Sequence, residues 1–92
     1  MITINFFTTL RIFLKTEQVK VQTTQVNMKE LLQKCEEQIS KRFLHKLLDP
    51  AGKIMPGTMI LINGQNVLHL NGLNTVVKGG DVVALFPPGG GG

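Results

Sequence analysis

Residues 28–39 are the one stretch of this chain with the spacing of a long apolar helix face, and they limit the possible folds more than any other feature. The apolar side chains recur every three or four positions, as in an amphipathic helix: Met28, Leu31, Leu32, Cys35 and Ile39. Asn27 precedes the stretch, and Glu30 stands three positions after it, which is typical of a capping box. We expect the helix to end between Ser40 and Leu44. One helix cannot bury its apolar face alone, so the rest of the chain must supply a sheet.

The segments on both sides of this helix have the patterns of short β-strands. Residues 2–6 and 19–23 alternate apolar with polar side chains, which predicts an antiparallel hairpin. Residues 59–62 are continuously apolar, which predicts a strand buried on both faces, and Asn63-Gly64 predicts a tight turn into a return strand. The return strand is predicted at residues 67–70, and two further strands are predicted at residues 76–77 and 82–86. Together they predict an α+β fold with a mixed, four- to five-stranded sheet packed on one main helix.

Length and composition exclude several classes of function. A chain of 92 residues forms one domain, which we place at residues 1–88, with a glycine tail at 89–92. One cysteine and two histidines exclude a disulfide framework and the usual zinc sites, so no metal is expected. The ten basic residues are dispersed and lack interleaved Trp or Tyr, so nucleic acid is not an expected partner. No membrane span or signal peptide is recognisable, and we expect a cytoplasmic protein.

Two compositional features remain. Four of the ten glycines are Gly89, Gly90, Gly91 and Gly92. Residues 1–53 carry nine basic and five acidic side chains, whereas residues 54–92 carry one of each. A sheet face built from the uncharged part would expose an apolar patch, and such patches usually bind a partner.

Both ends of the sequence resemble one family. Residues 6–11 (Phe-Phe-Thr-Thr-Leu-Arg) are similar to its N-terminal strand end and Leu-Arg element, and residues 80–88 (Gly-Asp-Val-Val-Ala-Leu-Phe-Pro-Pro), followed by Gly91-Gly92, resemble its C-terminal signature. This family is the ubiquitin-like β-grasp sulfur carriers, especially the small subunit of molybdopterin synthase and the small archaeal modifier proteins. The resemblance spans essentially the whole chain. Gly89 and Gly90 depart from it, because the family often has larger residues there.

The resemblance implies a carrier without catalytic residues of its own. An adenylyltransferase of the ubiquitin-activating type would use ATP to activate the carboxylate of Gly92, which then becomes a thiocarboxylate or forms an isopeptide bond. No cofactor would be held stably. Gly89, Gly90 and Gly91 suit insertion into a narrow channel, because glycine has no Cβ and adopts almost any φ/ψ. The large subunit of molybdopterin synthase would be the second partner.

The same resemblance indicates which residues contact these partners. Phe7 and Phe86 are the family's contact positions, and we place Val67, Leu85, Pro87 and Pro88 on the same face. Alternation along residues 2–7 points Phe6 inward and Phe7 outward, whereas Phe86 fits a contact or a core position equally well. Cys35 lies on the apolar helix face and is read as a buried hydrophobic residue; His45 and His69 are isolated.

Three functions remain compatible with the sequence. The first is a sulfur carrier for molybdopterin or tungstopterin synthesis. The second is a protein modifier that is joined through Gly92 to lysines of target proteins. The third is a β-grasp binding module with an inert tail.

Overall fold

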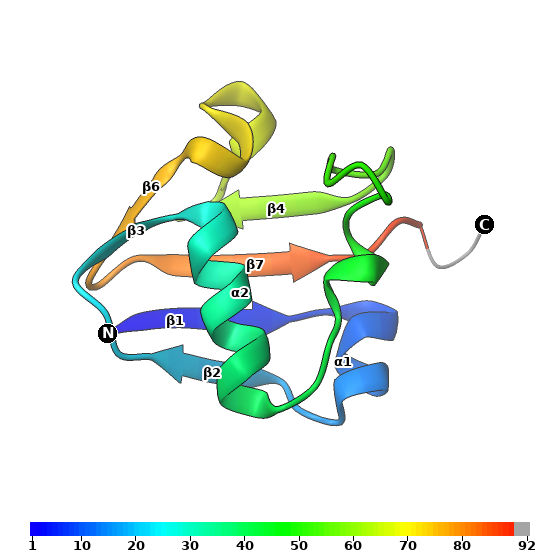
Figure 1. Ribbon diagram of the computed structural model, residues 1–92, viewed down its shortest axis with the longest axis horizontal. Coiled ribbons are helices and arrows are strands. Elements are labelled where there is room, and N and C mark those ends of the chain that lie inside the picture. The colour runs from blue at the N-terminus through cyan, green and yellow to red at the C-terminus, as the bar shows by residue number, and fades with distance from the viewer. Residues whose placement is uncertain (90–92) are drawn as a thin grey trace.

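The computed structural model describes residues 1–89, and Figure 1 shows their arrangement. Seven strands, two α-helices and three short 3-10 helices (η) follow one another along these residues. In chain order they are β1 (Ile2–Phe6), α1 (Thr8–Leu14), β2 (Gln18–Val21), β3 (Gln25–Asn27), α2 (Met28–Ile39), η1 (Leu44–Lys46), β4 (Met59–Ile62), β5 (Gln65–Asn66), η2 (Val67–His69), η3 (Gly72–Asn74), β6 (Val76–Lys78) and β7 (Val82–Phe86).

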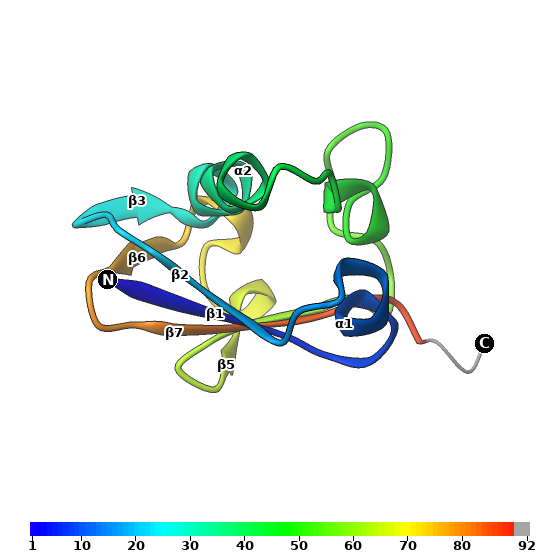
Figure 2. The same cartoon turned by 90° about the horizontal axis from the view of Figure 1, so that it is seen from below.

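The main sheet has five strands in the order β2-β1-β7-β4-β5. The first and last strands of the chain, β1 and β7, pair in parallel at its centre, and the other neighbours pair antiparallel. A separate two-stranded ribbon joins β3 to β6. Figure 2 shows α1 and α2 on one side of the main sheet. The predicted α+β architecture, a mixed sheet packed on one main helix, is confirmed.

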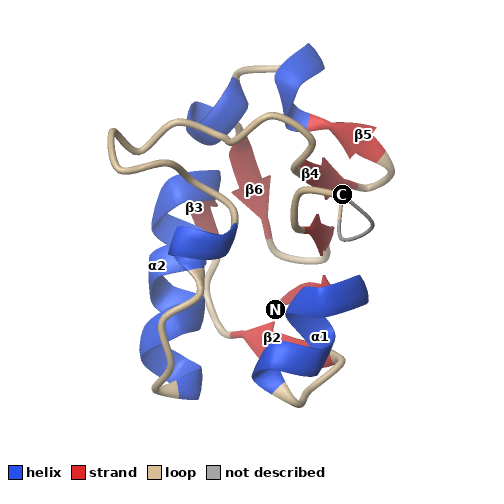
Figure 3. Cartoon of the chain, turned by 90° about the vertical axis from the view of Figure 1, so that its right-hand side faces the viewer, coloured by secondary structure: helices blue, strands red, loops and turns tan. Residues whose placement is uncertain are grey.

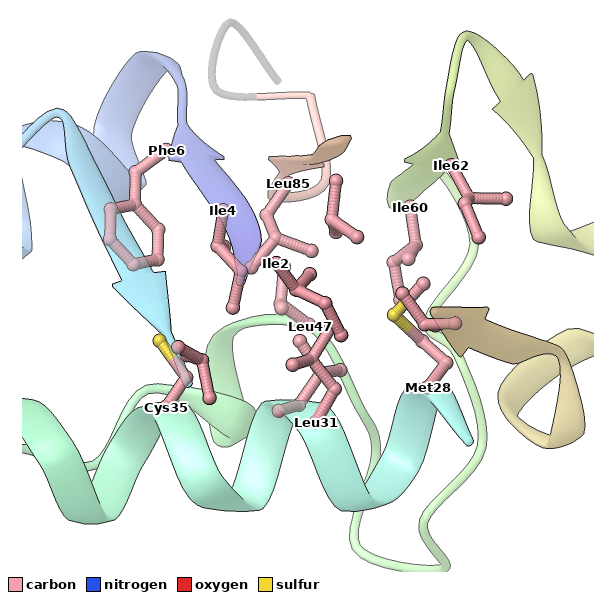
Figure 4. Packing of buried hydrophobic residues seen from close by; sticks show 14 of the residues in the cluster. Ile2, Ile4, Phe6, Met28, Leu31, Cys35, Leu47, Ile60, Ile62 and Leu85 are labelled. Atoms are coloured by element: carbon pink, nitrogen blue, oxygen red, sulfur yellow. The ribbon is translucent and has the colours of Figure 1, made fainter. Parts of the chain in front are cut away.

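The core lies between α2 and the inner face of the sheet. Alternate residues of β1, β4 and β7 point toward the helix and are almost completely buried: Ile2, Ile4, Phe6, Ile60, Ile62, Val83 and Leu85. Figure 4 shows several of them facing Met28, Leu31 and Cys35 of α2, with Leu47 between the layers. Phe43 closes one end of the core, where its ring meets the ring of Phe6 edge to face, with centroids 5.7 Å apart.

The capping box predicted from Asn27 and Glu30 is present. The Glu30 N–H donates to Asn27 Oδ1 at 2.8 Å, and the Asn27 N–H donates to Glu30 Oε1 at 3.1 Å. The helix ends at Ile39, and Ser40 follows in the left-handed region with a φ of 56°. Glu36 then fixes the next turn, because its Oε2 accepts the N–H groups of Phe43 and Leu44 at 2.7 and 2.9 Å.

The structure corrects the predicted return strand at residues 67–70. Asn63 and Gly64 do form the expected turn, with φ values of 49° and 84°, but β5 ends at Asn66. The Asn66 side chain accepts the N–H of Leu68 at 3.0 Å, which turns the chain into η2 and sends Val67 into the core. Residues 59–62 are also not buried on both faces, because Met59 is 42% exposed.

Helix α1 was not predicted from the sequence. Only Leu10 and Leu14 of its seven residues are buried, so its buried face is a single pair of residues at a spacing of four. The helix ends at Leu14, and the next residue, Lys15, takes a left-handed φ of 57° without being glycine. No helix among residues 1–89 has the length and apolar character needed to cross a membrane.

We expect Asn27→Ala to lower the free energy of unfolding by about 1 kcal/mol, because it removes the side-chain acceptor of the α2 cap. For a domain of this size that is a fall in Tm of roughly 4–8 °C, which thermal unfolding followed by circular dichroism measures. Asn27→Asp keeps an acceptor oxygen and is the matched control. Equal destabilisation by both variants would contradict the role of the cap.

Candidate functional site

Two stacked phenylalanine rings mark the end of the main sheet from which the chain continues toward the glycine tail. Phe7 follows β1 directly, and Phe86 is the last residue of β7. Their rings are nearly parallel, with an interplanar angle of 7° and centroids 4.5 Å apart. The Phe7 N–H also donates to the Leu85 carbonyl at 3.1 Å, so backbone and side chains both hold this corner.

Both rings belong to the outer face of the sheet. Phe6 and Leu85, which are paired in register, are 1% and 0% exposed and point into the core. Because side chains alternate between faces, Phe7 and Phe86 point the other way, and both are half-buried. The predicted inward direction of Phe6 and outward direction of Phe7 agree with this arrangement, and the open alternative for Phe86 is decided in favour of the outer face.

An apolar strip continues from this pair across the outer face. Met59 of β4 is paired with Phe86, and Leu61 is paired with Ala84. Met59 and Val82 are each 42% exposed, while Leu61 and Ala84 are half-buried. We call this set the outer strip: Phe7, Met59, Leu61, Val82, Ala84 and Phe86. Neither β4 nor β7 contains a charged residue, so the strip is apolar along both strands.

Three residues predicted to lie on this face are instead buried. Val67 and Leu85 are both 0% exposed, because η2 turns Val67 into the core and Leu85 occupies an inward position of β7. Pro87 is also buried and lines a small cavity with Leu10 and Phe13 of α1 and its neighbours. Met59 and Leu61 are not among the predicted contact residues, although the almost uncharged composition of residues 54–92 was the signal for such a patch.

Residues 87–89 leave β7 between α1 and the loop before β4, at the end of the molecule that faces the viewer in Figure 3. Pro88 is half-buried and lies beside Gly57 of that loop. A Cβ added to Gly57 would meet Pro88 Cα and Gly89 N at 3.6 Å. Gly57 has a φ of +87°, so glycine suits this turn. Gly90, Gly91 and Gly92, the rest of the predicted reactive tail, lie outside the described residues.

The only cysteine of the sequence is buried in the core. Cys35 is fully buried on the inner face of α2. Burial, with a smaller contribution from the negative charge of Glu36, raises the pKa of the Cys35 thiol to about 12. The thiol is therefore protonated near neutral pH, which is typical of a structural cysteine and not of a nucleophile. Among residues 1–89, no three His, Cys, Asp or Glu side chains are placed to hold a metal ion.

Sequence comparison identifies the family to which this arrangement belongs. A family model described as the ThiS family matches residues 4–92. The chain belongs to the ThiS family. The predicted resemblance to ubiquitin-like β-grasp sulfur carriers and small archaeal modifier proteins is confirmed.

Two curated relatives match parts of this ThiS family chain. A protein of Archaeoglobus fulgidus named as a sulfur carrier protein is 40% identical over 55 residues, which are 60% of this chain and 62% of the relative. Small archaeal modifier protein 3 of Haloferax volcanii is 44% identical over 41 residues, which are 45% of each chain. The chain thus spans less than two thirds of either relative.

A solved structure matches over the full length. A chain in the crystal structure of the BexX/CysO complex of Amycolatopsis orientalis aligns over 100% of both chains with a TM-score of 0.80 and 22% identity. This likeness shows a common fold.

We expect Leu85→Ala and Phe86→Ala, at adjacent positions of β7, to differ sharply in stability. Leu85→Ala leaves a core cavity and should lower the free energy of unfolding by about 2–5 kcal/mol. Phe86→Ala removes an aromatic stack at the surface and should cost about 1 kcal/mol. Urea unfolding of both variants measures the difference. A larger loss for Phe86→Ala would place Phe86 in the core and contradict its assignment to the outer strip.

We also expect Cys35 to be protected in the folded chain. Because the thiol is buried and its pKa is raised, iodoacetamide at pH 8 should leave it unmodified in the native state. Unfolding in guanidinium chloride should make it react completely, which intact-mass spectrometry detects. Rapid, stoichiometric alkylation of the native chain would contradict this environment.

Proposed function

We propose that this chain is a sulfur carrier that is activated at the carboxylate of Gly92 and donates sulfur in the synthesis of molybdopterin or tungstopterin. The observation that carries the proposal is the position of the outer strip. Phe86 is the last residue of β7, three positions before the first tail glycine, and the ring of Phe7 is stacked on it. A partner that binds the strip therefore also receives the tail.

The chemistry needs no side chain of this protein. A carboxylate oxygen of Gly92 attacks the α-phosphorus of ATP and displaces pyrophosphate, which forms an acyl-adenylate. Hydrosulfide then attacks the acyl carbon and displaces AMP, so that one oxygen is replaced by sulfur. An adenylyltransferase of the ubiquitin-activating type would supply the ATP site, and the large subunit of molybdopterin synthase would supply the site where the sulfur is used.

The domain would contribute binding and direction. Aromatic side chains are frequent hot spots of protein interfaces, and Phe7 and Phe86 are the aromatic members of the outer strip. Pro87 and Pro88 fix the direction in which the chain leaves β7, because the proline ring restricts φ. The membership of the ThiS family and the relative named as a sulfur carrier support this proposal. In the complex of Amycolatopsis orientalis, CysO is held with a partner named BexX, which supports a carrier that acts within a complex.

The alternative is a protein modifier that forms an isopeptide bond between Gly92 and target lysines. The relative named small archaeal modifier protein 3 favours it. Activation to the acyl-adenylate is common to both functions, and they diverge in whether sulfur or a lysine amine attacks the acyl carbon.

Intact-mass spectrometry of the chain isolated from its host tests the carrier. We expect a species heavier by about 16 Da, the difference between sulfur and oxygen. A variant without Gly91 and Gly92 should lack it, and Cys35→Ser should keep it, which separates a thiocarboxylate from oxidation of the Cys35 thiol, because one added oxygen also raises the mass by about 16 Da. If the heavier species is absent from the full-length chain, the carrier proposal is wrong.

The same cultures test the modifier. Lys78 is the last lysine or arginine of the sequence, so trypsin would leave residues 79–92 attached to a modified lysine. Branched peptides with this 14-residue remnant would establish the modifier. If neither the heavier species nor the branched peptides appear, the remaining function is a binding module with an inert tail.

A further inference from the structure

Two lysine ammonium groups lie over the ring of Phe13 in α1. Phe13 lies beside Pro87, which together with Pro88 we call the tail root. The Lys41 ammonium lies 4.3 Å from the centroid of the Phe13 ring and donates to the Phe13 carbonyl at 2.8 Å. The Lys46 ammonium lies 4.7 Å from the same centroid, and the His45 ring meets it edge to face at 6.0 Å. Arg42 is exposed beside Lys41, and both line a hollow at the C-terminal end of α2. We call Lys41, Arg42 and Lys46 the cation cluster.

The cluster is not neutralised within the described residues. Among residues 1–89, the ion pair within 4.0 Å is Arg11 with Glu17, and none involves a member of the cluster. Glu36, which borders the same hollow, directs its Oε2 to the N–H groups of Phe43 and Leu44. Glu37 also borders the hollow but makes no ion pair with the cluster. Converging, unpaired ammonium groups create a positive potential that attracts anionic groups.

The cluster is continuous with the root of the tail. Lys46 and Phe13 line one small cavity together with Pro87, the last buried residue before the glycines. α1 lies at the end of the molecule where β7 ends (Figures 1 and 3). A protein that encloses the tail must therefore approach both the outer strip and the cation cluster.

We propose that the cation cluster binds aspartate and glutamate side chains at the rim of the site that receives the tail. This inference rests on the proposed function, since it names the chemistry of the surface that the activating partner presents. Carboxylates are the groups that ammonium and guanidinium bind most directly on a protein surface.

Two other anionic partners fit the structure less well. A fully extended tail of residues 89–92 spans about 13–14 Å, so a nucleotide that reacts with the Gly92 carboxylate would lie about that far from Pro88, away from the domain surface that carries the cluster. Single-stranded nucleic acid stacks its bases on exposed aromatic rings. The Phe13 ring is half-buried and is already in contact with both ammonium groups.

The test is ATP–pyrophosphate exchange catalysed by the host's adenylating enzyme, with the full-length chain as the varied substrate. We expect Lys41→Glu combined with Lys46→Glu to raise KM by about tenfold at low ionic strength, because charge at an interface rim governs association. kcat should stay unchanged, and the difference in KM should shrink in about 0.5 M salt, where surface charges are screened. Lys41→Arg with Lys46→Arg should restore the KM of the wild-type chain.

The matched control is Lys29→Glu combined with Lys34→Glu. Both lysines are exposed on α2, so the net charge changes equally without touching the cluster. Equal KM values for the two double variants would overturn the proposal, as would a salt-independent loss or binding of RNA that only the cluster variant lacks. If the wild-type chain supports no exchange, the proposed function itself fails. Should the cluster variant not fold, Lys46→Gln is expected to give a smaller, salt-dependent increase in KM.

Discussion

The parallel pairing of β1 with β7 is the interaction on which the rest of the structure depends. It brings the first and last strands of the chain together at the centre of the sheet, with Phe6 opposite Leu85. Parallel strands cannot be joined by a tight turn, so the intervening chain has to cross the sheet, and α2 makes that crossing over the inner face. The same pairing places Phe7 beside Phe86 and directs residues 87–89 out past α1. The register of β1 against β7 therefore determines the positions of the core residues, of the candidate interface and of the two prolines that precede the tail.

Alternation along β7 divides this strand between stability and binding. Val83 and Leu85 are completely buried against α2, whereas Val82, Ala84 and Phe86 belong to the outer strip. A shift of one residue in the register would exchange these two sets and destroy both surfaces. The core contacts of Leu85 therefore fix the direction of Phe86, and the sequence of this strand is constrained on both faces.

The sequence predicted those features that local chemistry decides. Asn27 and Glu30 cap α2 within one turn, and Asn63 with Gly64 accepts the positive φ that their hairpin requires. Features that depend on packing between residues far apart in the sequence, such as the burial of Val67 and Pro87, could not be predicted from local sequence patterns. Val67 has the apolar character of a strand residue, but the Asn66 side chain turns it into η2, and packing against the core keeps it buried. Pro87 is predicted to lie on the contact face with Phe86, but it is buried beside α1, a helix whose only buried residues are Leu10 and Leu14.

On the proposed function, the nature of the tail explains why the domain would use two binding surfaces, the outer strip and the cation cluster. Glycines have no side chains, so the tail offers a partner few contacts of its own, and affinity has to come from the folded domain. Apolar burial at the outer strip is not directional and cannot by itself set the angle at which the tail approaches a channel. The charges of the cation cluster are suited to that task, because complementary charges orient two proteins as they associate. Three of the nine basic side chains of residues 1–53 form the cation cluster, and residues 54–92, which are almost uncharged, supply most of the outer strip. The first part of the chain supplies the cations beside α1, and the second supplies β4 and β7 of the outer strip, so that the tail leaves the domain at the boundary between them.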